Sequence, residues 1–249
     1  MHPAQPVRPE ESRHKERERK KEKERNNSRK TGQKINTMKP IAIAIMSALL
    51  FTGLSAQEMK PIKLNAPDKS KGLNIMKALE LRASYREFAD TPLNLQELSD
   101  LLWAANGINR PEKSGRTAPS AMNAQDVDIY VLTSEGAYFY DFAQHTLNPV
   151  AAGDHRNLVA GRQVSVAAAP VILIMVSDLA RFRGEDENQK MKTACIDVGT
   201  VSQNISLFCS GTGLVTVPRM GMDQEGLRKV LQLKESQRLI LNNPVGHRK

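Results

Sequence analysis

The stretch PVILIMVSD, residues 170–178, decides the fold class because it contains six consecutive apolar residues, four of them β-branched. A continuous apolar run of this kind is typical of a strand that is covered on both faces. We therefore expect it to form the central strand of a sheet flanked by helices. A helix over residues 155–168 is expected to lead into this strand.

The run MKTACIDVGTVSQNISLFCSGTG, residues 191–213, predicts one long helix from about residue 190 to residue 210. Further apolar residues surround its main apolar stripe, so we expect the helix to be buried, either in the core or against a second subunit. The stripe consists of Ala194, Val198, Val201, Ile205 and Phe208.

The only two cysteines, Cys195 and Cys209, lie on this predicted helix, 14 positions apart. At about 1.5 Å of rise per residue they are about 21 Å apart, whereas a disulfide needs Cα atoms within about 7 Å of each other. Neither has a metal-ligating neighbour, and we expect two buried free thiols.

Two helices are expected before the sheet. Residues 73–81 have a short amphipathic pattern, and LNLQELSDLLWAANG, residues 93–107, carries start and stop signals. Asn94 is placed as the N-cap with Glu97 at the third helical position, and Leu93 and Leu98 are placed to form a hydrophobic staple. Gly107 is placed to end the helix.

The remaining patterns complete an α+β domain over residues 73–249, with a mostly antiparallel sheet and an N-terminal segment, residues 57–72, before it. VDIYVLT, residues 127–133, and AYFYDF, residues 137–142, predict a hairpin. Residues 223–231 predict a short helix, residues 238–242 a last strand, and residues 108–119 a polar loop.

The first 56 residues differ in composition from this domain. Residues 1–37 contain 12 Lys and Arg, 6 Asp and Glu and no aromatic residue, which predicts disorder. The following MKPIAIAIMSALLFTGLSAQE has the layout of a signal peptide cleaved after Ala56. Its apolar run of 14 residues is short of the roughly 20 that span a bilayer as a helix. We expect export to the periplasm, no stable membrane span, and a true start at Met38.

The net charge of +9 belongs mostly to this N-terminal part, because residues 57–249 carry 23 Lys and Arg against 21 Asp and Glu. We therefore expect no nucleic-acid partner. A nucleic-acid binder that uses residues 1–34 is a rival hypothesis, and its signature is steeply salt-dependent binding.

This chain lacks the sequence motifs of several enzyme classes. There is no G-x-S-x-G of a serine hydrolase and no Cys or His pair with zinc-ligand spacing. The glycine-rich stretch at Gly211 has Thr216 where a dinucleotide fingerprint needs its third glycine. We expect no metal site.

Two short stretches carry the candidate site. In RASYREF, residues 82–88, alternate side chains of an extended chain point the same way, so Arg82, Ser84 and Arg86 converge. Two guanidinium groups and a hydroxyl suit a phosphate and its neighbouring hydroxyls. In GRTAPSAMNAQ, residues 115–125, small side chains let backbone amides approach a planar ligand, and Asn123 and Gln125 offer donors and acceptors to its edge. Taken alone, each stretch also fits an ordinary surface loop.

The order of the motifs resembles the flavin-dependent nitroreductase family over residues 73–249. They are R-x-S-x-R-x-F, the L-x-x-L-L-W-A-A-x-G helix, P-S-A-x-N-x-Q before a strand, D-x-G-x-x-x-Q-N on the long helix followed by G-L, and a closing P-V-G. R-T-A-P-S-A and Y-F-Y-D-F are most similar to the branch that includes azoline-ring dehydrogenases, which form thiazoles in peptide toxins.

The resemblance implies an α+β fold that binds FMN at the interface of an intertwined homodimer, with the long helix, including Asp197, at that interface. Arg82, Ser84 and Arg86 would hold the FMN phosphate and ribityl chain, and Arg248 or Lys249 would complete the phosphate site. The flavin ring would be contacted by the loop of one subunit and by the segment after the long helix of the other. These two groups are Pro119, Ser120, Ala121 and Asn123, and Leu214, Val215, Thr216 and Val217.

The chain departs from the family pattern at two positions near these residues. Ala83 stands where many relatives have a second arginine, and Met122 stands where many have glycine. The methionine would narrow the space above the flavin.

The implied activity is a two-electron reduction of nitroaromatics, quinones or similar acceptors, with NADH or NADPH as the electron donor. The chemistry takes place at the flavin, and no side chain is catalytic. Two alternatives stay open. One is an exported FMN dehydrogenase or oxidase of an envelope or peptide substrate, because nicotinamide cofactors are scarce outside the cytoplasm. The other is a flavin-binding module without turnover.

Overall fold

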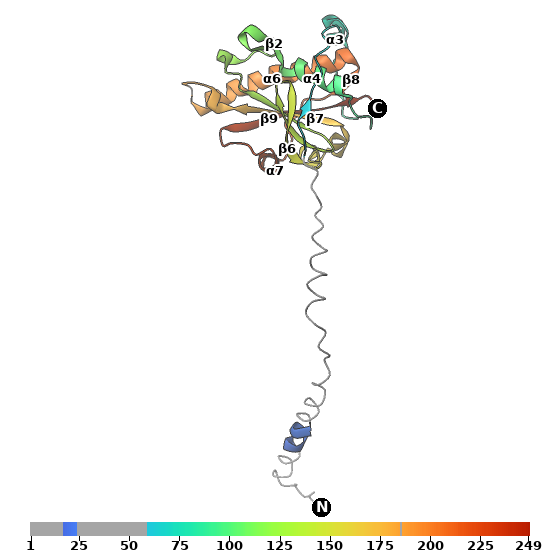
Figure 1. Ribbon diagram of the computed structural model, residues 1–249, viewed down its shortest axis with the longest axis vertical. Helices are drawn as coiled ribbons and strands as arrows, with labels where there is room; N and C mark the ends of the chain where they lie inside the picture. The colour runs from blue at the N-terminus through green and yellow to red at the C-terminus, as the bar shows by residue number, and fades with distance from the viewer. Residues whose placement is uncertain (1–16, 24–58, 185) are drawn as a thin grey trace, which may run out of the picture. The chain divides into compact units, whose positions relative to one another are not determined.

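The computed structural model describes residues 17–23, 59–184 and 186–249 (Figure 1). The chain divides into two compact units, Met1–Gln57 and Glu58–Lys249. In the first unit, residues 17–23 form a short exposed helix. The expected signal peptide, with its cleavage after Ala56, and most of the expected basic extension lie outside the described residues. None of the helices within the described ranges is sufficiently long and apolar to cross a membrane.

The second unit is built on a seven-stranded sheet whose strand pairs are all antiparallel, which confirms the predicted α+β class. The strand order is β1-β6-β5-β4-β7-β9-β8. Their bounds are β1 Ile62–Lys63, β4 Val127–Leu132, β5 Gly136–Asp141, β6 Thr146–Ala152, β7 Val171–Asp178, β8 Leu214–Thr216 and β9 Gln237–His247.

Strand β7 is central, as its apolar run predicts, and all eight of its residues are buried. It pairs with β4 on one side and β9 on the other. Because side chains alternate along a strand, Leu173 and Met175 enter one hydrophobic core and Ile172 and Ile174 enter the other. Each face of the sheet therefore needs its own layer of helices.

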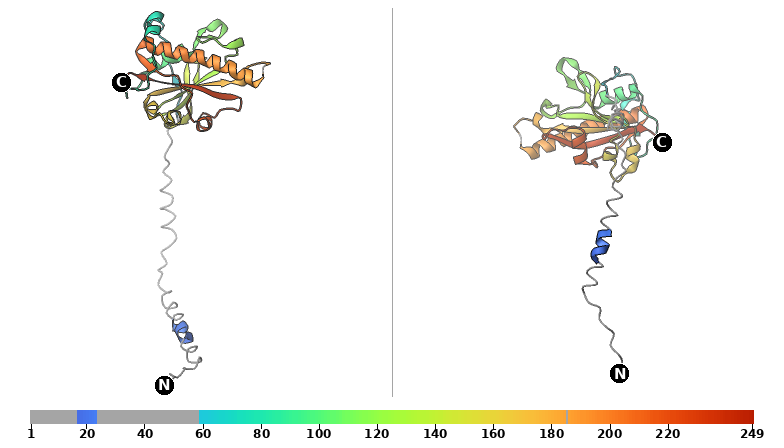
Figure 2. Two further views of the ribbon diagram at one scale, coloured as in Figure 1. Left: turned by 180° about the vertical axis from the view of Figure 1, so that it is seen from behind. Right: turned by 60° about the horizontal axis from the view of Figure 1, so that its bottom comes forward.

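The helices are divided between these two faces (Figure 2). On one face lie α4 Leu95–Asn106 and α6 Glu187–Thr212, with α3 Ile75–Leu81 packed on α6. On the other lie α5 Asn157–Ala160, the 3₁₀ helix η3 Val164–Ala168 and α7 Gln224–Val230. The 26-residue α6 ends at Gly213, which has a φ of 82° and so adopts a left-handed conformation that glycine allows.

Local sequence signals place the start and end of α4 correctly. The Asn94 side chain accepts a hydrogen bond from the Glu97 amide, and the Glu97 carboxylate accepts one from the Asn94 amide. Both contacts of the capping box are therefore present, and Gly107 follows the last helical residue.

Several predicted elements differ in the structure. The helix expected over residues 155–168 is broken into α5 and η3, because Gly161 has a φ of 54° between them. The loop expected over residues 108–119 contains a small hairpin, β2 Ile108–Arg110 and β3 Gly115–Arg116. Strand β9 is longer than expected, β6 was not predicted, and Cys195 is exposed whereas Cys209 is buried.

Candidate functional site

The RASYREF segment lies along the β8 edge of the sheet. Arg82 caps the end of α3, and Ser84 then bridges Thr216 in parallel while the Tyr85 amide donates to the Thr216 carbonyl at 3.0 Å. Farther on, Phe88 bridges Arg248 and the Ala89 amide donates to the His247 carbonyl at 3.0 Å. The structure therefore brings together three predicted parts of the site: residues 82–86, residues 214–217 and the C-terminal Arg248.

Positive charge gathers at this edge without a matching carboxylate. Arg82, Arg86 and Arg248 are exposed, and none of them forms an ion pair with any described residue. The Arg248 guanidinium lies 5.1 Å from the centre of the Tyr85 ring. Burial lowers the pKa of Arg219, and the nearby Arg86 charge lowers it further. Because like charges this close repel, the edge is suited to an anion such as a phosphate.

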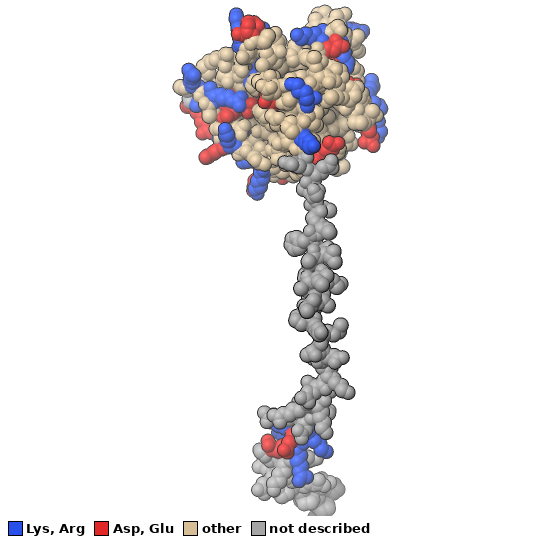
Figure 3. All heavy atoms as spheres, viewed as in Figure 1, with Lys and Arg blue, Asp and Glu red and all other residues tan. Residues whose placement is uncertain are grey.

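Elsewhere on the surface the two charge signs are mixed. On the face drawn in Figure 3, basic and acidic side chains alternate over the second unit rather than forming one basic patch. The described exposed lysines of α3 and α7, Lys77 and Lys229, each pair with a glutamate of their own helix. The arginines beside β8 belong to the described basic residues that form no ion pair, and what sets them apart is that the contacts of residues 84–88 with Thr216 and Arg248 gather them at one edge of the sheet.

A cavity of about 160 Å³ adjoins the RASYREF segment. The segment lines it with Ala83 and Tyr85, whereas Arg82, Ser84 and Arg86 do not line it. Arg248 also lines the cavity, as does the end of α6, where Ser206 and Ser210 contribute hydroxyls. The lining is mixed, since Leu81, Leu214 and Val215 lie beside these serines, and the serine hydroxyls could bond a hydroxylated chain as donors or acceptors.

The predicted ring-contacting residues of β8 are covered by the protein itself. Leu214, Val215, Thr216 and Val217 are all buried, with 2–5% of their surface exposed. The Thr216 hydroxyl accepts from the Asn243 amide at 3.1 Å. Any ligand beside this segment would therefore contact its backbone more than its side chains.

The second predicted stretch, here called the 119–125 loop, lies on a different part of α6. The Ala121 amide donates to an Asp197 carboxylate oxygen at 2.8 Å, and the Gln125 amide donates to the Ser120 hydroxyl at 2.8 Å. Met122 is 62% exposed, and it has a φ of 54° beside Asn123 at 52°. The loop is thus fixed at its base while Met122 projects outward.

The two halves of the predicted site are far apart within one chain. Asp197 holds the loop, whereas the Ser210 hydroxyl bonds the Ala78 carbonyl near the arginine segment, 13 positions further along α6. At ~1.5 Å per residue this is about 20 Å. The arginine segment and the 119–125 loop therefore lie at different points along α6.

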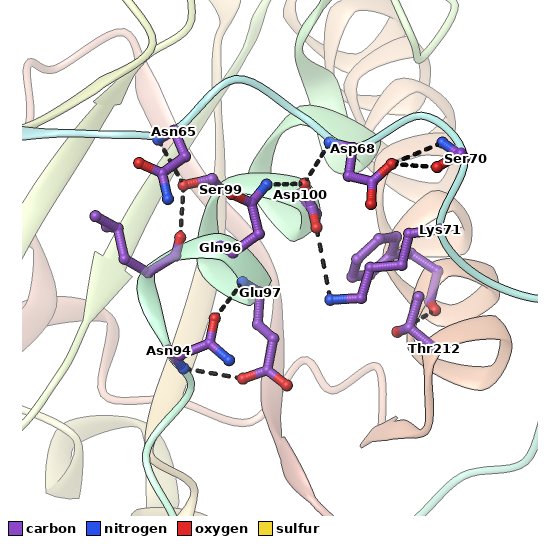
Figure 4. Close-up of polar contacts among 12 residues, drawn as sticks. Asn65, Asp68, Ser70, Lys71, Asn94, Gln96, Glu97, Ser99, Asp100 and Thr212 are labelled. Carbon is purple, nitrogen blue, oxygen red and sulfur yellow. Dashed lines mark hydrogen bonds and ion pairs between the residues drawn. The ribbon is translucent and has the colours of Figure 1, made fainter.

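Two features of this region were missed by sequence reasoning. The first is the segment of residues 59–72, which is tied to α4 by polar contacts (Figure 4). The Asn65 amide donates to Ser99, the Asp68 amide donates to Asp100, and Lys71 lies 3.6 Å from the other Asp100 oxygen. Asp100 is 2% exposed although it lies outside the apolar stripe of α4, so no local pattern indicated that it would be buried.

The second missed feature is a buried carboxyl pair, Asp126 and Asp197, beneath the 119–125 loop. Ser177 donates to Asp126, and the adjacent loop residues Ser120 and Ala121 donate to Asp126 and Asp197 respectively, which places the two carboxyl groups side by side. Burial first, and then the neighbouring Asp197, raise the pKa of Asp126 to about 7. A carboxyl directly before a strand gave no sequence signal that it would meet one on a helix 71 positions away.

Comparisons with known proteins agree with one another. The model described as "Nitroreductase family" matches residues 79–247. A proposed nitroreductase of Methanocaldococcus jannaschii is 30% identical over 196 residues, which cover 75% of this chain and 97% of that protein. The crystal structure of a proposed nitroreductase from Ralstonia eutropha has 33% identity and a TM-score of 0.72, over 77% of this chain and 90% of its own. An NADPH:FMN oxidoreductase from Vibrio harveyi, solved with NAD+, shares the fold at 20% identity with a TM-score of 0.53, over 70% of this chain and 69% of its own.

Proposed function

The chain belongs to the nitroreductase family and is an FMN-dependent oxidoreductase, and on this premise we propose that it transfers two electrons from NADH or NADPH to nitroaromatics, quinones or similar acceptors. The observation that carries the assignment to this site is the set of exposed arginines without carboxylate partners beside β8. Two of these arginines, Arg82 and Arg86, are the arginines of the family motif R-x-S-x-R-x-F.

The residues present fit the phosphate end of FMN. Arg82, Arg86 and the Ser84 hydroxyl would bind the phosphate and the first hydroxyls of the ribityl chain, and Arg248 or Lys249 would complete the site. Guanidinium groups bind phosphate through charge-assisted, often paired hydrogen bonds. Binding of the dianion would also relieve the repulsion that Arg86 exerts on Arg219.

The family also supports a homodimer, which would bring the two halves of the site together. Apolar side chains of the chain before and within α3 are exposed, among them Leu73 at 50%, Ile75 at 58% and Met76 at 71%. An apolar surface of this kind marks an interaction site. In the dimer, the 119–125 loop of one subunit would face the flavin ring bound at the β8 edge of the other.

Bound FMN supplies the redox chemistry, since it can take a hydride from a nicotinamide and pass the electrons to an acceptor. The arginines would hold the phosphate, and the ring would lie between β8 of one subunit and the 119–125 loop of the other. Met122, fixed in an outward position, would limit the thickness of an acceptor that stacks on the ring. No described side chain is required as an acid or base for hydride delivery.

A second candidate function follows from the predicted signal peptide. If the protein is exported to the periplasm, scarce nicotinamide cofactors there favour an FMN dehydrogenase or oxidase of an envelope or peptide substrate. Both candidates use the same flavin site and differ in the electron donor.

Steady-state assays of the purified, FMN-loaded protein test the proposal. We expect oxidation of NADH or NADPH that depends on an added quinone or nitroaromatic, with parallel lines in double-reciprocal plots from a ping-pong cycle. Failure to oxidise either nicotinamide with any such acceptor, by protein that binds FMN, would exclude the reductase and favour the dehydrogenase.

A further inference from the structure

A pair of buried carboxyl groups lies at the base of the 119–125 loop. Asp126, directly before β4, has no exposed surface, and Asp197 of α6 is 4% exposed. The Ala121 amide donates to Asp197 at 2.8 Å. The Ser120 hydroxyl accepts from the Gln125 amide and donates to an Asp126 carboxylate oxygen at 3.4 Å. The loop is therefore attached to both carboxyl groups at once.

The neighbouring arginines form their hydrogen bonds with groups other than this pair. Arg181 donates twice to Asp128, at 2.7 and 2.9 Å, and once to the Gln125 carbonyl at 2.7 Å. Arg116 donates to the Val127 carbonyl and lies 3.4 Å from the centre of the Phe142 ring. The charged groups around the pair come from β3, β4, the end of β7 and the 3₁₀ helix η4 Leu179–Arg181; they are Arg116, Asp128, Asp178 and Arg181. Asp126 forms no ion pair with any residue that the structure describes.

Two neighbouring buried carboxyl groups that form no ion pair are more stable while they share a proton, because two adjacent buried negative charges repel strongly. We propose that Asp126 and Asp197 are such a proton-sharing pair, which positions the 119–125 loop on α6 and loosens it when both groups ionise. The Ser177 hydroxyl, which donates to Asp126, fixes the orientation of that carboxyl in the pair.

The pH dependence has a defined sign. A carboxyl whose pKa is raised in the closed loop keeps its proton there, whereas in the open loop it ionises near its ordinary value. The closed form is therefore favoured at low pH and loses this advantage as the pH rises from about 4 to about 7, the pKa of Asp126. Above that range no further change is expected. The loop is therefore held most tightly near pH 4 and least tightly above about pH 7.

Amide hydrogen exchange of Ala121 and Gln125 in the full chain tests this positioning role. After correction for the intrinsic exchange rate, we expect protection to fall by up to about tenfold per pH unit between pH 4 and pH 7 and then to level off. Asp126→Asn keeps the hydrogen bonds of a protonated carboxyl and cannot ionise, so its protection should be independent of pH. Asp154→Asn, which removes a partly exposed carboxylate paired with Arg156, is the matched control and should retain the wild-type profile.

Equal protection at pH 5 and pH 8 in the wild type, or the same loss in Asp126→Asn, would overturn the proposal. If Asp126→Asn does not fold, Asp197→Asn removes the repulsion between the two groups, and the fall in protection should end at a lower pH because only burial then raises the pKa of Asp126. FMN affinity measured over the same pH range adds a separate readout, which rests on the proposed function. A loop that responds to pH without a change in FMN affinity would support the pair and count against the loop's place at the flavin.

Discussion

Replacement of Arg86 by alanine isolates the contribution of the arginine cluster to FMN binding. Arg86 is exposed, and no side-chain hydrogen bond or ion pair joins it to a described residue. Its charge lies close enough to Arg219 to lower the pKa of that group. Stability should therefore change by less than about 0.5 kcal/mol, so that any change in ligand affinity reports on binding.

The expected loss of affinity follows from the kind of contact. A hydrogen bond to a charged group contributes about 1.5–3 kcal/mol. Since 1.4 kcal/mol corresponds to a factor of ten, Arg86→Ala should weaken FMN binding by about 10- to 150-fold. Riboflavin, which lacks the phosphate, should bind both proteins almost equally. The difference for FMN should shrink at high salt because exposed charges are screened.

Quenching of FMN fluorescence in a titration of the apoprotein measures both affinities. Lys229→Ala removes one positive charge from an exposed i,i+4 pair on α7 and serves as the control, with no expected effect on FMN. If Arg86→Ala bound FMN as tightly as Lys229→Ala does, the phosphate would not be held by the RASYREF segment.

Three further predictions concern the fold, the assembly and the carboxyl pair. Asn94→Ala should lower the free energy of unfolding by about 1 kcal/mol in urea titrations, because it removes the N-cap of α4; an unchanged midpoint would contradict this. Met76→Glu places a charge on the exposed apolar surface of α3 and should shift the protein from dimer to monomer in sedimentation, whereas a wild type that is itself monomeric would refute the dimer. Because folding raises the pKa of Asp126 to about 7, unfolding free energy should fall by at most about 1.4 kcal/mol per pH unit between pH 4 and pH 7, and Asp126→Asn should reduce this slope.

Elements with local signals could be predicted from the sequence. The capping box of α4 needs only Asn94 and Glu97, three positions apart, and both contacts form. Strand β7 could be predicted from its own apolar run, because every residue of a strand that is buried on both faces can be apolar. The hairpin of β4 and β5 likewise follows from alternation around a short turn.

Elements whose stability comes from distant contacts could not be predicted. Strand β9 continues through Asn242 and Asn243 because their buried side chains bond Arg219 and Thr216, and nothing in the local pattern shows those partners. Strand β6 contains Pro149 opposite Tyr138 next to a register shift, so its alternation is irregular.

The candidate site shows the same limit. Alternation along RASYREF indicated a phosphate site, and the structure places that segment beside β8 and Arg248. Sequence alone did not show that Asp197, expected at a subunit interface, bonds the Ala121 amide within the same chain. Nor could it show that Arg219 is held by Gln163 and by the Val159 carbonyl. Such contacts join residues far apart in the chain, and only the folded arrangement reveals them.

The proposed activity requires that this chain bind FMN at the arginine cluster and that the bound flavin accept and pass on electrons. The most direct test is the visible absorbance spectrum of the FMN-loaded protein before and after anaerobic addition of NADH or NADPH. We expect protein-bound flavin bands that bleach with a nicotinamide and recover when air is admitted. A protein that binds no flavin, even after FMN is added in excess, would contradict it.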